Sequence, residues 1–163
     1  MSVSASIDLK VIGRNGFSPT ASYIIESLLA NGWSIYFEDK VSYLPINDND
    51  MFDWQHKSID QTTLMNIIKR KESLYEKVGL LIVYGETGIG GDLLIDSYID
   101  IDDDLSICNS NNIDITFCLG VNRLKLKNIK EKDITDVGWY FERIIPYLET
   151  EKTFLVSITF AQY

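Results

Sequence analysis

The stretch VGLLIVYGETGIGGDLLIDSYIDI, residues 78–101, decides the fold of this chain. Its first seven residues, Val78–Tyr84, are continuously apolar and of strand length, which is typical of a strand buried on both faces. After a glycine-rich connection at 85–91, apolar and polar residues alternate from Leu93 to Ile101, the period of a half-buried strand. The two segments therefore predict neighbouring strands joined by a hairpin.

The rest of the chain adds more strands and about three helices to this pair. Apolar residues at helical spacing predict three helices, which follow Ser18-Pro19, the capping box Ser58–Gln61, and Asp136. Pro146 should tighten the last turn of the third helix. The segment 109–112, Asn-Ser-Asn-Asn, predicts a turn between two strands. The other predicted strands cover residues 5–11, 33–37 with 41–44, 105–107, 113–119 and 154–160. We expect an α/β or α+β fold: a single domain over residues 1–163 with a mixed, mainly antiparallel sheet and about three helices packed on it.

The charge of the chain is negative and concentrated in one segment. Residues 78–122 hold eight of the 24 acids and no Lys or Arg, and the formal net charge is −9. Because phosphates and anionic lipids repel such a protein, we expect neither nucleic acid nor a membrane surface as partner. No secretory signal or membrane-spanning run is recognisable, which predicts a cytoplasmic protein with Cys108 and Cys118 as reduced thiols. The sequence leaves the oligomeric state open.

Four sequence patterns suggest chemistry, and each is either incomplete or too common to identify it. The glycine loop 85–91 has no following lysine, and Asp92 stands where a phosphate would be repelled. The acidic run 100–104 lacks the glycine and glutamate of a calcium loop, which leaves weak calcium binding as the alternative. The tripeptide Glu38-Asp39-Lys40 is too common to identify a nuclease, and His56 has no nucleophile motif beside it. We therefore predict no catalytic residue, no metal ligand and no cofactor.

The acids themselves are the most informative pattern. If the isoleucines of the strand 93–101 face the core, the intervening acids form a ladder on the other face, and like charges there destabilise a sheet unless a partner neutralises them. We expect a surface that binds a basic protein; a solvated face, or charges that discourage edge pairing, is the alternative. The predicted partner-binding residues are Glu86, Asp92, Asp96, Tyr98, Asp100, Asp102, Asp103 and Asp104.

In size, acidity, mixed α/β content and lack of catalytic motifs, the chain resembles bacterial immunity proteins of polymorphic-toxin and contact-dependent growth inhibition systems. The segment 136–143, DVGWYFER, before a final strand is similar to segments of such proteins. The resemblance implies a cytoplasmic inhibitor that binds and covers a basic toxin domain, typically a nuclease. Two alternatives stay open: a small enzyme with catalytic carboxylates around the glycine loop, and a structural or adaptor subunit of a larger assembly.

Overall fold

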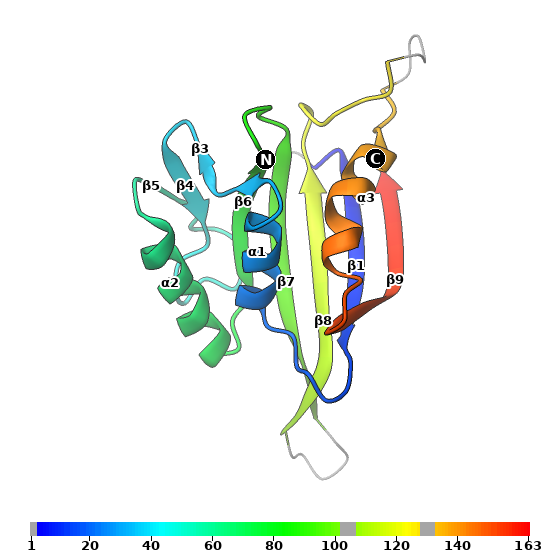
Figure 1. The fold of residues 1–163 in the computed structure, drawn as a ribbon. Coiled ribbons are helices and arrows are strands. Elements are labelled where there is room, and N and C mark those ends of the chain that lie inside the picture. The colour runs from blue at the N-terminus through cyan, green and yellow to red at the C-terminus, as the bar shows by residue number, and fades with distance from the viewer. Residues whose placement is uncertain (1–2, 102–106, 128–132) are drawn as a thin grey trace.

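The computed structural model describes residues 3–101, 107–127 and 133–163, with side chains for all of these except 97–101 and 107–111. Strands and helices follow one another along the chain as shown in Figure 1. The elements are β1 (Ala5–Gly13), α1 (Ala21–Leu29), β2 (Trp33–Ser34), β3 (Tyr36–Phe37), β4 (Lys40–Tyr43), β5 (Gln55–Lys57), α2 (Gln61–Ser73), β6 (Val78–Tyr84), β7 (Gly90–Ile101), β8 (Ile107–Leu119), α3 (Val137–Ile144), the 3-10 helix η1 (Ile145–Tyr147) and β9 (Thr153–Gln162).

The strands form one sheet in the order β3-β4-β6-β7-β8-β1-β9, with β2 paired to β6 and β5 paired to β4. All strand pairs between the described elements are antiparallel. The buried run β6 pairs with β7 through the predicted glycine hairpin, and β1 lies between β8 and the last strand, β9. The mainly antiparallel sheet with three helices confirms the predicted fold class.

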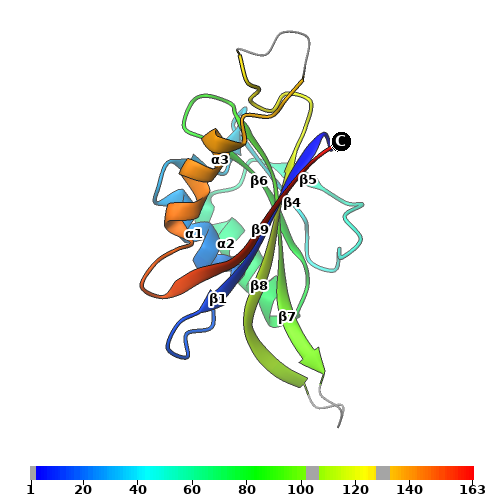
Figure 2. The ribbon, with the colours of Figure 1, turned by 90° about the vertical axis from the view of Figure 1, so that its right-hand side faces the viewer.

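The core lies between the sheet and its helices. Along β1, β7 and β8 every second side chain is buried on one face, and α1 and α3 cover that face, whereas the segment leading into β5 projects on the other side (Figure 2). An aromatic cluster of edge-to-face contacts ties α3 to the sheet, and each such side chain contributes about 1.5–3 kcal/mol on burial. Its members are Trp33, Tyr84, Phe117, Trp139 and Tyr140.

The turn predicted at 109–112 is wrong, because this segment lies inside the single long strand β8. Strand pairing with β7 continues at both ends of the segment, where Ile113 lies opposite Ser97 and Asn109 lies opposite Ile99. The register shift between these pairs takes up the extra residues of β8 as a bulge. Polar residues with turn chemistry are therefore accommodated by an irregularity of the strand instead of ending it.

The predicted helices are present, but two of them begin at other residues than expected. The hydroxyl of Thr20, not Ser18, accepts the Tyr23 amide at 3.1 Å, and the carboxylate of Asp60, not Ser58, accepts the Thr63 amide at 2.7 Å. Pro146 ends α3 in a 3-10 turn, as predicted. Among the described residues, no helix combines the length and the apolar composition needed to cross a membrane.

Candidate functional site

The candidate site is the face of the sheet that α1 and α3 leave uncovered, which we call the outer face. Strand register places its side chains in three rows that run across β7, β8, β1 and β9. Each row carries at least one carboxylate, so the acids of distant segments meet on one surface. The rows are Asp96–Asp114–Lys10–Ser157, Leu94–Thr116–Asp8–Thr159 and Asp92–Cys118–Ser6–Ala161.

The outer face is hollowed along its width by four cavities of about 270, 430, 460 and 310 Å³. Neighbouring cavities share lining residues: the first and second share Leu81, the second and third share Val3 and Cys118, and the third and fourth share Asp8 and Thr116. They therefore form one continuous depression from β3 to β9, which we call the outer trough.

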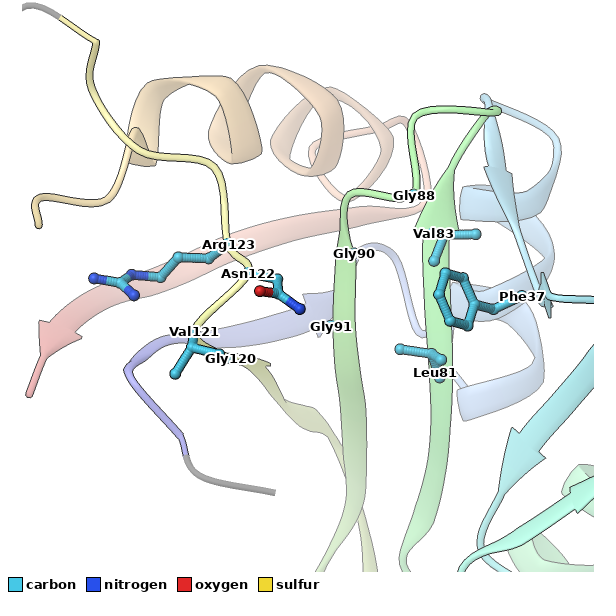
Figure 3. Close-up of a pocket in the computed structure, with 10 residues that line it drawn as sticks. All are labelled: Phe37, Leu81, Val83, Gly88, Gly90, Gly91, Gly120, Val121, Asn122 and Arg123. Atoms are coloured by element: carbon cyan, nitrogen blue, oxygen red, sulfur yellow. The ribbon is translucent and has the colours of Figure 1, made fainter.

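The β3 end of the outer trough is apolar (Figure 3). Phe37, Leu81 and Val83 lie on one side of this first cavity, and Val121 lies across it. The strand between them contributes only backbone there, because it carries Gly90 and Gly91. No larger residue fits at Gly90, since an added Cβ would lie 1.9 Å from the carbonyl oxygen of Ile82. Glycine keeps this part of the trough free of side chains. Arg123 lines the same cavity, but its guanidinium points away from it towards the loop that holds Asp133.

The segment between β4 and β5 forms one wall of the trough and is held in place by a side chain of α2. Nζ of Lys71, on α2, is buried and donates to the carbonyl oxygens of Pro45 and Asp48 at 2.6 and 3.3 Å. Asp48 in turn accepts the amides of Asp53 and Asp50 at 2.7 and 3.1 Å, and these bonds, that of Asp53 first, hold the pKa of Asp48 below its usual range. These contacts hold the segment, most of which is exposed, in a fixed position against α2.

The acids of the outer face differ in how the fold neutralises them. Asp96 forms an ion pair with Lys77 at 3.4 Å, and Asp8 accepts the Thr116 hydroxyl at 2.7 Å. Asp92 is half-buried, and within the described part of the chain no hydrogen bond or ion pair engages its carboxylate. Burial raises the pKa of Asp92, an effect that the nearby His56 opposes.

The predicted partner-binding residues fall in three places. Asp92 and Asp96 lie on the outer face, and Glu86 lies exposed in the β6–β7 hairpin. Tyr98 lies at the register shift of β7 and Asp100 lies beyond it, but their side chains are outside the described residues, as are all of Asp102, Asp103 and Asp104. The ladder predicted for these residues therefore stays a prediction.

The structure adds three charged residues to the outer face that the predicted set omitted: Asp8, Lys10 and Asp114. Asp8 and Lys10 are on β1, about 70 residues before the acidic window, so only strand pairing brings them there. The alternation of polar and apolar residues from Ala5 to Val11 was the available signal, because it assigns both side chains to the solvent side of the first strand.

The second cavity also brings together several groups with chemical potential. The Ser42 hydroxyl lies 2.7 Å from Nδ1 of His56, and Asp92 and Cys118 line the same cavity. Cys118 is a free thiol whose pKa is raised by burial first and then by the charges of Asp92 and Asp8, which makes it a poor nucleophile at neutral pH. Among the described residues, no group of three His, Cys, Asp or Glu side chains is arranged to hold a metal ion.

Comparisons of the chain with protein-family models, with curated proteins and with solved structures found no match.

Proposed function

We propose that this chain is a bacterial, cytoplasmic immunity protein that binds a basic toxin domain and covers it without performing catalysis itself. The observation that carries the proposal is the outer trough, a continuous depression on the helix-free face of the sheet that holds acids from three strands. An acidic, hollowed surface favours encounter with a basic protein and excludes anionic partners by repulsion.

The trough supports a protein partner better than a small molecule. It combines an apolar end at Phe37 and Leu81 with the acids Asp8 and Asp96 towards β9, and protein interfaces combine apolar and polar surface in this way. Its four cavities share lining residues and lie in sequence across the sheet, which suits a partner segment that follows its width.

The proposal is tested with the gene adjacent to the one that encodes this chain. We expect that gene to encode a protein with a basic C-terminal domain that arrests growth when expressed alone in a bacterial host, and that co-expression of this chain restores growth. Purified together, the two should form a complex of one copy each. A neighbouring product that is harmless, or whose toxicity this chain does not relieve, contradicts the proposal.

Association kinetics test the role of the outer face. Changing Asp8, Asp96 and Asp114 together to Asn should slow association and flatten its dependence on salt, because steering by exposed charges is screened by ions. A second set, Asp100, Asp102 and Asp104 to Ser, tests the ladder predicted from the sequence. The matched control changes the exposed acids Glu26, Glu142 and Glu151 to Gln, which alters the net charge equally away from this face. Equal effects of all three sets would mean that net charge alone acts.

A hydrolase is the second candidate, because the Ser42–His56 hydrogen bond at 2.7 Å has the geometry of a nucleophile and its base. A fluorophosphonate probe decides between the two: labelling of Ser42 that is lost in Ser42→Ala and in His56→Gln supports the enzyme. Absence of labelling, together with neutralisation of a toxin by Ser42→Ala, supports the non-catalytic proposal.

A further inference from the structure

Asp92 is an acid of the outer trough that the fold provides with little compensation. Asp114 likewise has no hydrogen bond or ion pair to its carboxylate from a described residue, but it lies directly across from Lys10 in the strand register, whereas Leu81 and Cys118 lie across from Asp92. Asp96 has Lys77 as its ion-pair partner, and Asp8 accepts a hydrogen bond from Thr116. The carboxylate of Asp92 has neither kind of contact with any residue that the structure describes. A half-buried carboxylate without a partner is costly for a protein, because burial disfavours its charged form.

The surroundings of Asp92 are apolar on the side where the cavity opens. Leu81 and Leu94 flank it on the sheet, directly across from it on β6 and two residues along β7, and Trp54 faces the sheet from the anchored wall. The Ser42 hydroxyl stands in the same cavity, whose volume is about 430 Å³. His56 and Cys118 also line the cavity, which therefore offers apolar side chains, the indole ring of Trp54, an imidazole and one carboxylate.

This combination matches the parts of one side chain. An arginine has an aliphatic stem that packs on leucine, a planar cation that stacks on tryptophan, and donors that pair with a carboxylate. Lysine shares the stem and the charge, but it lacks the planar group that uses the ring of Trp54. The acidic rows beside the cavity would attract the same basic partner.

We propose that the Asp92 cavity receives an arginine side chain of the basic partner, with its stem between Leu81, Leu94 and Trp54 and its guanidinium at Asp92. The inference rests on the proposed function and assigns the anchoring contact of that interface. Burial of this carboxylate, which raises its pKa in the free protein, is then compensated in the complex.

The probe is Nα-acetyl-arginine N-methylamide, titrated into the isotope-labelled full chain and followed by the indole N–H resonance of Trp54. A ligand of this size should saturate with a Kd of about 1–20 mM. Two further probes share its capped backbone: the citrulline derivative, which has the same length but is neutral, and the lysine derivative, which is charged but one atom shorter. We expect citrulline to bind at least about tenfold more weakly and lysine about threefold more weakly.

Two variants locate the binding. Asp92→Asn should weaken arginine binding by about tenfold, whereas the matched control Asp96→Asn, on the same strand and face, should change it by less than about twofold. The inference is overturned if Trp54 shows no saturable shift up to about 50 mM arginine probe. It is overturned equally if the citrulline or the lysine derivative binds as tightly as the arginine derivative. It is also overturned if Asp92→Asn and Asp96→Asn weaken arginine binding by the same factor.

These outcomes are distinct from a failure of the proposed function. If the wild-type chain neutralises the toxin and Asp92→Asn does so with unchanged affinity, the immunity function stands and the arginine anchor is refuted. If no toxin is neutralised while the arginine probe binds at Asp92, the cavity is a cation site and the proposed function fails.

Discussion

Replacing the buried Lys71 by methionine should destabilise the protein and loosen the wall of the outer trough. Methionine keeps most of the apolar stem but removes donors to Pro45 and Asp48, at 2.6 and 3.3 Å, and each hydrogen bond to a charged group is worth about 1.5–3 kcal/mol. It also removes a positive charge that interacts with the buried carboxylate of Glu76. Relief from burying the ammonium, which lowers the pKa of Lys71, offsets part of this loss. We expect a net loss of about 3 kcal/mol.

The assay is urea unfolding combined with native-state hydrogen exchange. A loss of about 3 kcal/mol lowers the Tm of a domain of this size by roughly 6–12 °C. In addition, the substitution should speed hydrogen exchange at the amides of Asn47, Asp50 and Asp53, relative to the wild-type chain, more than at the amides of β6. The carboxylates of Glu76 and Asp48 bind these three amides. The control is Lys69→Met, exposed on the same helix, which should change stability by less than about 0.5 kcal/mol. A loss below about 1 kcal/mol for Lys71→Met, or uniform exchange, would refute the anchoring role.

Three further changes test other parts of the structure. Asp92→Asn should raise the Tm at pH 7 and leave it unchanged near pH 3. The reason is that burial places the pKa of Asp92 in the native state above its unfolded value of about 3.9. The contribution of Asp92 to stability is therefore fully present below about pH 3.9 and is lost as the pH rises through the native pKa. A Tm difference that is constant with pH contradicts this. Tyr140→Phe should cost about 1–2 kcal/mol in urea unfolding, because its buried hydroxyl accepts the Leu124 amide at 2.9 Å; no loss would mean that water replaces the bond. Gly90→Ala should cost about 3 kcal/mol, because the new Cβ meets the Ile82 carbonyl, and a stable variant would show that β6 and β7 can separate there.

Local periodicity was enough to predict the fold class. The continuous apolar run of β6 and the alternation in β1 and β7 identify strands, because burial on one face or on two leaves a direct mark on the sequence. Breaks in the strands were harder to predict. The segment 109–112 has the composition of a turn, but pairing of its neighbours with β7 keeps it within β8, and such pairing depends on residues far along the chain.

The candidate site was only half predictable for the same reason. The acids at 92 and 96 could be assigned to one face from their spacing, but the sequence window without Lys or Arg is not free of them in space. Lys10 arrives on the outer face from β1, and Lys77 reaches Asp96 from the residue before β6. Lys71 is a second case, since a lysine on the apolar side of a helix gives no local sign that loop carbonyls will bind it.

This neutralisation changes which acids should matter, and in which kinetic step. Asp96, whose side chain is 53% exposed and already paired with Lys77, can contribute to long-range steering but loses little when a partner binds. Asp92 is half-buried and unpaired among the described residues, so contact with a cation there would be desolvated and strong. Removal of Asp96 should therefore act on the association rate and on its salt dependence, and removal of Asp92 on the dissociation rate. Under the proposed function, the local concentration of acids should bring the basic partner to the outer face, and the cavity at Asp92 should hold it there.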